Sequence, residues 1–430
     1  MNLSVPQPET AIAGEQRGAF SLLFFCLISV GMGQSLMFAV LPPVARSMGL
    51  TELQVGAIFA ISAVLWVLGS PFWGRRSDHW GRRPVIITGL CGYAVSMVAF
   101  GLCVQAGLSG WLALWPAYLL MIASRSIFGA FGSATMPAAQ AYIADRTPPA
   151  DRAARLTILG AAFGLGVTLG PGLVALLLPL GLMVPFYAVG VLGALSALVM
   201  RLKLPEIRPP KPHAGSVRRI RALDSRLLPF LLVGIVIAIS QASTMQTAGF
   251  YAIDVLGMEV EQSARFVGLA LMGTAGCALF AQLVIVRMLR PLPRTMMAAG
   301  VFCGFLAFAT LVLGESAVSM FVALMALGFT FGLTQPGAVA GASLCAGADQ
   351  QGAVTGLMNT TGAIGVIFAP FVGMPLYQWL PQAPYVLNML LAALALVFVL
   401  LHPRIRDARP GGGQPPVLNL SAFPWRICVK

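Results

Sequence analysis

The stretch "GRRSDHWGRRP", residues 74–84, decides the fold because it packs four arginines and one aspartate between two long apolar runs. An apolar run of about 20 residues is what a helix needs to cross the ~30 Å hydrocarbon core of a bilayer. With 430 residues, 58% hydrophobic and 10% charged, and a mean hydropathy of +0.86, the chain is predicted to be an all-α membrane protein. It contains twelve such runs, over residues roughly 19–41, 53–73, 84–106, 113–136, 157–179, 182–201, 227–250, 264–287, 295–313, 317–340, 353–377 and 384–402.

The basic residues follow an alternating pattern along the connections between these runs. Of the 27 lysines and arginines, all except Arg46, Arg125 and Arg265 fall on one side of the membrane when connections are counted in turn. Basic loops stay preferentially in the cytoplasm. The pattern therefore predicts a multi-pass protein of the inner or plasma membrane with both termini cytoplasmic. It also accounts for the net charge of +13 without a nucleic-acid partner.

The spans divide six and six around one long polar connection, residues 202–226, which is rich in proline and basic residues. Glycines at short intervals followed by a proline occur in both halves, in "GAAFGLGVTLGPGLVALL" (160–177) and "GAIGVIFAPFVGMPLY" (362–377). Such internal repeats are typical of duplicated transporters. We predict two pseudo-symmetric six-helix bundles, 19–201 and 227–402, with the 202–226 linker between them, a cytoplasmic tail at 1–18 and a disordered tail at 403–430.

Asp78 needs an explanation of its own, because acidic residues contribute little to orientation. The run 353–377 starts on the same side of the membrane, so the positive end of its helix dipole faces the same water layer. A carboxylate at Asp78 would latch the two halves together there, with Gly74 and Gly81 permitting a close turn. The alternative is that the arginines of this stretch only set the topology.

The same stretch resembles the loop signature G-x-x-x-D-x-x-G-R-R/K between the second and third spans of the major facilitator superfamily. Gly74, Asp78, Gly81, Arg82 and Arg83 carry the match, while Arg76 replaces a small hydrophobic residue. The resemblance implies a twelve-helix fold in two bundles and a conformational latch built from the aspartate and arginines.

Three further stretches extend the resemblance, which covers nearly the whole chain. "RSIFGAFG" (125–132) is similar to the family's fourth-span pattern of an arginine followed by spaced glycines. "AYIADRTPPADRAAR" (141–155), which contains Asp145, looks like the loop between spans four and five in the twelve-span drug:proton antiporter branch; we group Asp145 with the latch. "GAAFGLGVTLGPG" (160–172) resembles the antiporter signature of span five through Gly164, Gly170, Pro171 and Gly172.

Arg125 is the one basic residue well inside a span. A buried charge there costs several kcal/mol unless it faces a cavity or a partner, which makes it a functional candidate. The resemblance implies a role in proton coupling or in contact with an anionic substrate; the alternative is an arginine paired with backbone carbonyls. No acidic residue lies mid-span, and the first span offers only Gln34 and Ser35 where several exporters of the family carry an acid. Either Asp254, at an outer end, is the titrating group, or proton antiport is absent.

Polar and aromatic positions inside the spans are the candidates for a substrate cavity. The resemblance implies that spans one, four, seven and ten line it. The candidates are Gln34, Phe38, Phe128, Gln241, Gln246, Phe250, Gln335 and Asn359.

The sequence carries no motif of a nucleotide-binding loop, a hydrolase nucleophile or a metal site, and its seven cysteines and three histidines lack metal-ligand spacing. We therefore expect no enzyme activity, no metal and no cofactor. The preferred function is export of a small organic compound or drug by proton antiport, from a monomer in the lipid bilayer. The alternatives are a metabolite importer or uniporter without proton coupling, and a non-transporting receptor or scaffold.

Overall fold

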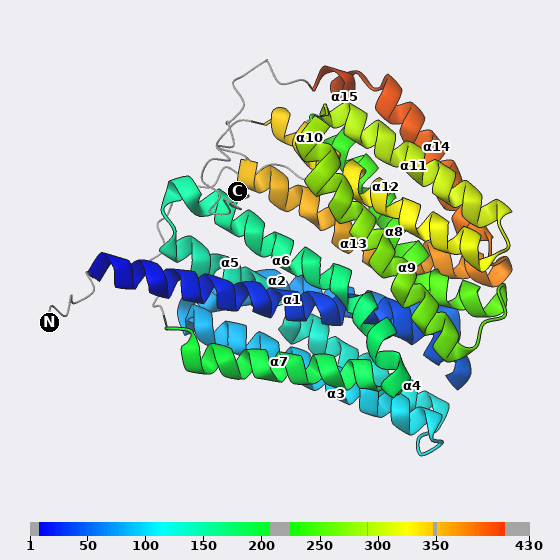
Figure 1. Ribbon diagram of the computed structural model, residues 1–430, viewed down its shortest axis with the longest axis horizontal. Coiled ribbons are helices and arrows are strands. Elements are labelled where there is room, and N and C mark those ends of the chain that lie inside the picture. Colours follow the sequence, from blue (N-terminus) through cyan, green and yellow to red (C-terminus); the bar gives the residue numbers. More distant parts are fainter. Residues whose placement is uncertain (1–7, 207–223, 290, 347–350, 409–430) are drawn as a thin grey trace, which may run out of the picture.

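The computed structural model describes residues 8–206, 224–289, 291–346 and 351–408, and these residues form helices joined by short turns, with no strand among them (Figure 1). Twelve helices or helix series are long and apolar enough to cross a membrane. Their number and order confirm the predicted all-α fold with twelve spans.

The first six spans are built by nine helical elements. The fourth span runs through α4, η1 and α5 without leaving the helical path, and η2 is a single turn that ends the fifth. The elements are α1 (Pro8–Met48), α2 (Glu52–Trp80), α3 (Arg82–Leu108), α4 (Leu114–Ile127), η1 (Phe128–Gly132), α5 (Thr135–Arg146), α6 (Pro149–Leu177), η2 (Leu178–Leu180) and α7 (Val184–Lys203).

The second six spans follow the same plan. The eighth span runs through α9, η3 and α10, and a short helix, α15, follows the last span. The elements are α8 (Leu228–Asp254), α9 (Val260–Phe280), η3 (Ala281–Val286), α10 (Arg287–Leu289), α11 (Pro293–Leu313), α12 (Ala317–Leu344), α13 (Gln351–Trp379), α14 (Ala383–Leu401) and α15 (Pro403–Asp407).

The tight turns between spans follow local chemistry. Thr51 caps α2 by a capping box, in which its hydroxyl accepts from the Gln54 amide at 3.3 Å and the Gln54 side chain accepts from the Thr51 amide at 2.8 Å. Gly81, the one residue between α2 and α3, has a φ of 96°, which L side chains rarely adopt. These two residues allow α1, α2 and α3 to reverse direction within very short connections.

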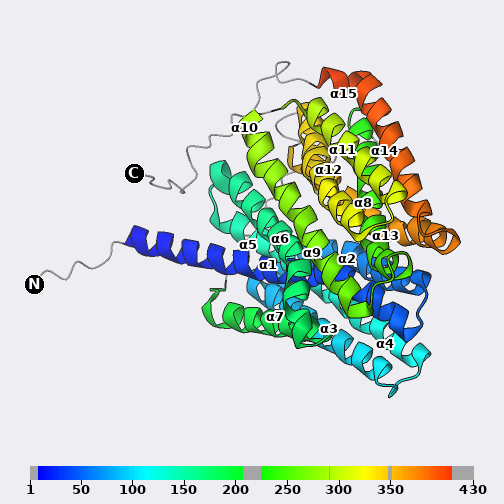
Figure 2. The same ribbon diagram turned by 45° about the vertical axis from the view of Figure 1, so that its right-hand side comes forward.

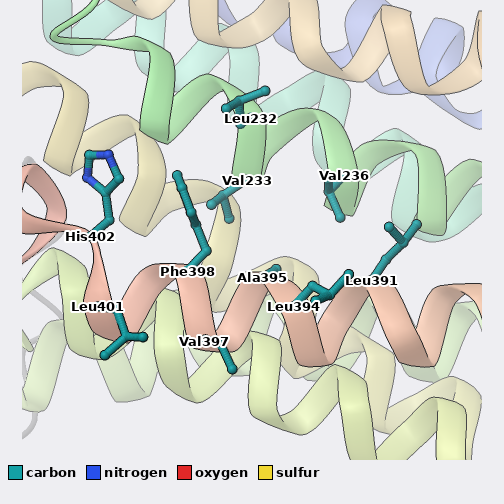
Figure 3. A pocket seen from close by; sticks show the side chains of 10 residues that line it. All are labelled: Leu232, Val233, Val236, Leu391, Leu394, Ala395, Val397, Phe398, Leu401 and His402. Carbon is teal, nitrogen blue, oxygen red and sulfur yellow. The ribbon is translucent and has the colours of Figure 1, made fainter.

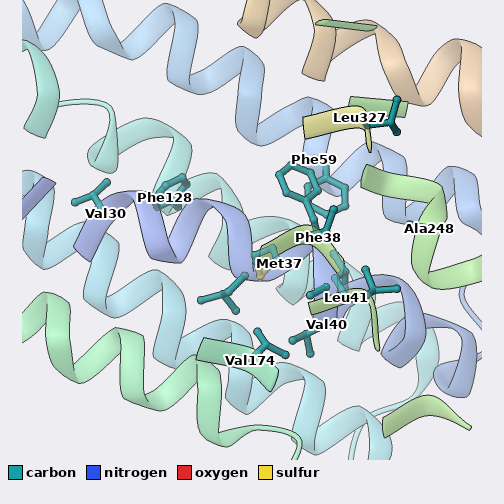
Figure 4. Packing of buried hydrophobic residues seen from close by; sticks show 14 of the residues in the cluster. Val30, Met37, Phe38, Val40, Leu41, Phe59, Phe128, Val174, Ala248 and Leu327 are labelled. Carbon is teal, nitrogen blue, oxygen red and sulfur yellow. The ribbon is translucent and has the colours of Figure 1, made fainter. Parts of the chain in front are cut away.

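Two bundles, α1–α7 and α8–α15, lie side by side and converge toward the right of Figure 1, and Figure 2 shows the same separation from another side. They meet mainly where α6 packs on α9, α2 on α13, and α1 on α8 and α9. α1 lies at the centre of this packing, as Figure 4 shows for its residues Val30 to Leu41. Phe38 of α1 stacks on Phe59 of α2 with ring centroids 4.8 Å apart.

The ends of the elements differ from the predicted boundaries in three places. α1 already begins at Pro8, inside the predicted 1–18 tail, and α7 continues to Lys203, into the predicted 202–226 linker. Residues 403–407 form α15 rather than the beginning of a disordered tail, because Pro403 starts a helical turn directly after α14. Residues 1–7, 207–223 and 409–430 of the predicted tails and linker lie outside the described residues.

The fourth span contains a π-helical segment that the sequence did not predict. α4 passes into the π-helix η1 at Phe128–Gly132, immediately after Arg125, before α5 resumes at Thr135. π-helical segments inside α-helices widen the turn and occur often at functional sites. The irregularity therefore lies close to Arg125.

Candidate functional site

A charged cluster joins the two bundles at the end where α1 and α8 stop. Arg46, in the last turn of α1, pairs with Asp254 at the end of α8 and, at 2.5 Å, with Glu52 at the start of α2. Tyr377 of α13 donates its hydroxyl hydrogen to Asp254 at 2.9 Å, and the Gln378 amide donates to Glu52 at 3.0 Å. We call these five residues the outer cluster. It holds residues of both bundles in one network of charged hydrogen bonds.

Phe250, one of the predicted cavity residues, belongs to the surroundings of this cluster. Its ring is fully buried, with the Arg46 guanidinium 5.0 Å from the ring centroid and the Tyr377 ring 6.1 Å away. A cation beside an aromatic face is attracted by the ring quadrupole. Phe250 therefore packs against the junction of the bundles.

Glycine–proline contacts bring the bundles close together at the same end. A Cβ on Gly56 of α2 would lie 2.6 Å from Pro370 of α13, and one on Gly249 of α8 would lie 2.8 Å from Pro43 of α1. Because real Cβ atoms do not approach so closely, only glycine permits these contacts without a shift of the helices. Proline rings of one bundle thus pack directly against glycines of the other near the outer cluster.

The antiporter-type helix α6 makes the same kind of contact with α9. A Cβ on Gly268 would lie 2.7 Å from the Pro171 carbonyl oxygen, and Gly172 lies against Met272. Gly170, by contrast, faces α1, where a Cβ would come within 2.5 Å of the Met32 carbonyl oxygen. Of the four predicted residues of this helix, Pro171 and Gly172 contact the second bundle and Gly170 packs within the first.

The inter-bundle faces are open toward the other end, which carries the arginine-rich turns. Gly164 and Gly160 continue the Pro171 face of α6 at helical spacing, and a Cβ at either would have nothing within 4 Å. The same holds for Gly276 of α9 and for Gly362 of α13, which lies two turns from Pro370 on the same face. The helices that touch beside the outer cluster therefore diverge toward the opposite end.

Arg125 is buried in the first bundle, with 3% of its surface exposed. Its guanidinium carbon lies 4.1 Å from the centroid of the Phe128 ring, and its Nε and Nη1 have no partner among the described residues. Phe128 in turn lies against Trp66 and Tyr93, with ring centroids 5.1 and 5.8 Å away. Because buried donors are normally satisfied, the free guanidinium edge is a candidate for a bound water or an anionic group.

The remaining cavity candidates are dispersed. The Gln34 Oε1 and both amide atoms of the fully buried Gln246 have no partner within the described chain, whereas Gln335 donates to the Thr361 hydroxyl at 3.1 Å. Gln241 is half-buried, Phe38 is in the stack with Phe59, and the side chain of Asn359 lies outside the described residues.

The candidate latch residues form a chain of ion pairs inside the first bundle. Arg82 binds Asp78 at 2.5 Å and, through its Nε, Asp145 at 2.9 Å. Arg82 is nearly buried, whereas 43% of the Asp78 side chain is exposed. Arg83 donates to the Arg201 carbonyl instead. The described partner of Asp78 is thus on the neighbouring helix α3 of the same bundle, and the expected contact with the start of α13 stays a prediction.

The outer cluster was largely missed by sequence reasoning, which named only Asp254 and Phe250 from this region. One signal was present: Arg46 is one of two bases on the side that the positive-inside pattern leaves almost empty. Arg46 and Asp254 are 208 positions apart in the sequence, and Glu52 and Gln378 are 326 positions apart. No local sequence pattern predicts these two long-range pairings.

Comparison with known proteins identifies the family. The chain is similar to Multidrug resistance protein 2 of Bacillus subtilis, 25% identical over 85% of this chain and 90% of that protein. It is also similar to the Quinolone resistance protein NorA of Staphylococcus aureus, 25% identical over 90% of this chain and 96% of that protein.

Solved structures share the fold at lower identity. A bacterial homologue of the human lysosomal transporter Spinster, in an inward-facing and unoccupied conformation, has a TM-score of 0.70, 15% identity and covers 93% of this chain and 99% of its own. The human organic anion transporter MFSD10 has a TM-score of 0.60, 19% identity and covers 89% and 99%. The family model described as Major Facilitator Superfamily matches residues 23–370. This chain, which carries the predicted twelve spans, therefore belongs to the major facilitator superfamily of membrane transporters.

Proposed function

We propose that this transporter exports a small organic compound in exchange for protons, by rocking its two bundles around a site between them. The names of two relatives, which describe multidrug and quinolone resistance, support export of a drug-like compound. The predicted cavity side chains are amides and aromatics, a composition that suits a moderately apolar ligand. Both termini are cytoplasmic in this proposal.

The observation that carries the proposal is the contrast between the two ends of the bundle interface. Arg46 and Asp254 join the bundles at one end, and Gly164 and Gly362 face open space toward the other. With the arginine-rich turns in the cytoplasm, the outer cluster closes the external side and the glycine faces open inward. A compound would then enter from the cytoplasm or the inner leaflet, as export requires.

Asp254 is the proposed coupling group. The groups that face it are Arg46, Tyr377 and, across Arg46, Glu52. A proton on Asp254 would remove the charge that holds Arg46 between the bundles, and external opening would become easier. Loss of that proton would restore the pair and close the external side. Arg125 is proposed to contact an anionic or electron-rich part of the substrate with its unpartnered nitrogens.

The inner end is proposed to close through the latch residues. When Gly164 and Gly362 come into contact with the opposite bundle, Asp78 approaches the positive N-terminal end of α13, while Arg82, itself paired with Asp145, holds it in place. Gly74 and Gly81 are proposed to allow the close approach.

Transport by purified protein in liposomes tests the proposal. A quinolone and a panel of apolar cations and neutral compounds are loaded, with and without an imposed pH gradient. Accumulation that rises with the gradient and vanishes in Asp254→Asn supports proton antiport. Counterflow that is indifferent to the gradient would favour the second candidate, a carrier without proton coupling, which the lack of an acidic residue in mid-span makes a specific alternative. Absence of flux for every compound would reject transport of this class.

A further inference from the structure

An apolar groove runs along the outside of the second bundle, between α8 and α14 (Figure 3). Its volume is about 640 Å³. Leu232 and Val236 line it from α8, and Leu391, Leu394 and Leu401 line it from α14. Phe398 points from α14 toward Val233 across the groove, as Figure 3 shows. The groove lies apart from the outer cluster and from Arg125.

The length of the groove matches one leaflet of a bilayer. Leu391 and Leu401 are ten residues apart on one helix, which corresponds to about 15 Å. That is half of the ~30 Å hydrocarbon core. The groove ends where α14 ends and α8 begins, so it reaches from the membrane surface to about the bilayer centre. Leu394 and Leu401 are exposed, Leu401 to 71%, and Leu391 is half-buried. An aliphatic chain is what such a surface accommodates.

Cationic side chains gather at the surface end of the groove. Arg404 of α15 donates to the Ser225 carbonyl just before α8, so it spans the end of the groove. Arg294 donates to the Leu400 carbonyl at 2.7 Å, and Arg226 pairs with Asp224 at 3.1 Å. His402 lines the groove itself, and its buried Nδ1 has no partner in the described part of the chain. Three arginines thus lie near this end together with the polar ring of His402, and Asp224 pairs with one of the three.

We propose that this groove is a binding site for one anionic phospholipid of the adjacent leaflet. One acyl chain lies between α8 and α14, and the phosphate contacts Arg404 and His402. A negative head group matches the charge at this end, whereas the groove supplies apolar contact and no polar anchor along its length. The leaflet is the inner one if the orientation under "Proposed function" holds; the site itself does not depend on transport.

Native mass spectrometry of the purified full chain in detergent tests the site. Phosphatidylglycerol and phosphatidylcholine with identical acyl chains are titrated separately. We expect one phosphatidylglycerol to bind several-fold more tightly than phosphatidylcholine. Arg404→Gln should lower that preference about fivefold, the effect of one basic residue at an anionic membrane surface. Arg201→Gln, an exposed arginine of α7 at the same end of the molecule, is the matched control and should leave it unchanged.

A second variant tests the apolar part independently. Ala395, 7% exposed, lines the groove between the two helices. Ala395→Leu should fill the groove and weaken both lipids, and Ala194→Leu on the exposed face of α7 is its control. Thermal unfolding of each variant verifies that the fold is retained.

Three outcomes would overturn the proposal. They are equal binding of the two lipids, an unchanged preference in Arg404→Gln, and a lipid-free dimer that Ala395→Leu dissociates, which would assign the groove to a second copy of the chain. The measurement contains no transport substrate and no pH gradient, so its failure leaves the proposed export untouched.

Discussion

Replacing Asp254 by asparagine should shift the protein toward a conformation open at the outer cluster. Arg46 and Asp254 pair across the bundle interface with 32% and 26% of their side chains exposed. The free energy lost on breaking such a pair should lie between that of exposed pairs, which are worth ~0.2–1 kcal/mol, and that of buried pairs, whose disruption costs ~3–5 kcal/mol. A loss of about 1.5 kcal/mol is a reasonable intermediate, and it corresponds to roughly a tenfold change in the ratio of the two conformations. Asparagine keeps the size and the hydrogen-bonding capacity of the side chain, so packing should be preserved.

Distances between spin labels measure this ratio directly. Ser109, in the turn between α3 and α4, and Glu315, between α11 and α12, are exposed on opposite bundles at the outer-cluster end. With the native cysteines replaced, labels at these two positions should report one main distance in the parent protein. In Asp254→Asn, the population of a longer distance relative to that main distance should rise about tenfold.

Glu261→Gln removes an exposed acid at the start of α9 and is the control, which should not change the distances. Labels on Arg75 and Arg287, at the opposite end, should become closer as the first pair separates. If Asp254→Asn gives the same distance distributions as the parent protein, the pair does not hold the interface closed and the reasoning fails.

Three further substitutions probe the other parts of the transport cycle. Gly164→Trp should leave thermal unfolding unchanged, because a Cβ there meets nothing within 4 Å, yet it should abolish transport by blocking closure of the inner end; a stable variant with parental flux would contradict the closure. Arg125→Ala should abolish transport in the liposome assay without loss of folded protein, since its Nε and Nη1 hold no partner in the described chain; unchanged flux would make the residue structural. Asp78→Asn should slow transport at least several-fold while lowering the free energy of unfolding by at most about 1 kcal/mol, because 43% of the Asp78 side chain is exposed and Arg82 keeps its pair with Asp145; parental flux would reject the latch.

Hydropathy alone was enough to predict the span count and the division of the chain into six and six. A membrane imposes a similar length and an apolar composition on every span, so each span can be predicted from its own sequence alone. The ends were less predictable. Pro8 starts α1 inside the predicted 1–18 tail and Pro403 starts α15 in the predicted 403–430 tail, because helix propensity near a span extends it into water.

Only part of the candidate site could be predicted from the sequence. Arg125 was identified because a charge inside a span is conspicuous, but the π-helix that follows it depends on packing against α2 and α3. Glu52, Tyr377 and Gln378 were not assigned to the site, since each is an ordinary residue near the end of a span. Their role comes from a contact between bundles, and the pairing of distant residues is not encoded in local pattern.

The two ends of the bundle interface differ in the chemistry that could seal them, and this difference gives the cycle a direction. At the outer cluster the ion pair of Arg46 with Asp254 runs between the bundles, so a change of charge on either residue acts on the interface itself. At the opposite end the latch pairs, Asp78 with Arg82 and Arg82 with Asp145, lie within the first bundle, and the glycine faces contribute only shape. In the proposed exchange, a proton on Asp254 would release the external side, whereas closure of the inner side would depend on packing and on the field of a helix end. An external proton and an internal substrate would then act at opposite ends of the bundle interface. Both would shift the same equilibrium between two conformations, as obligatory exchange requires.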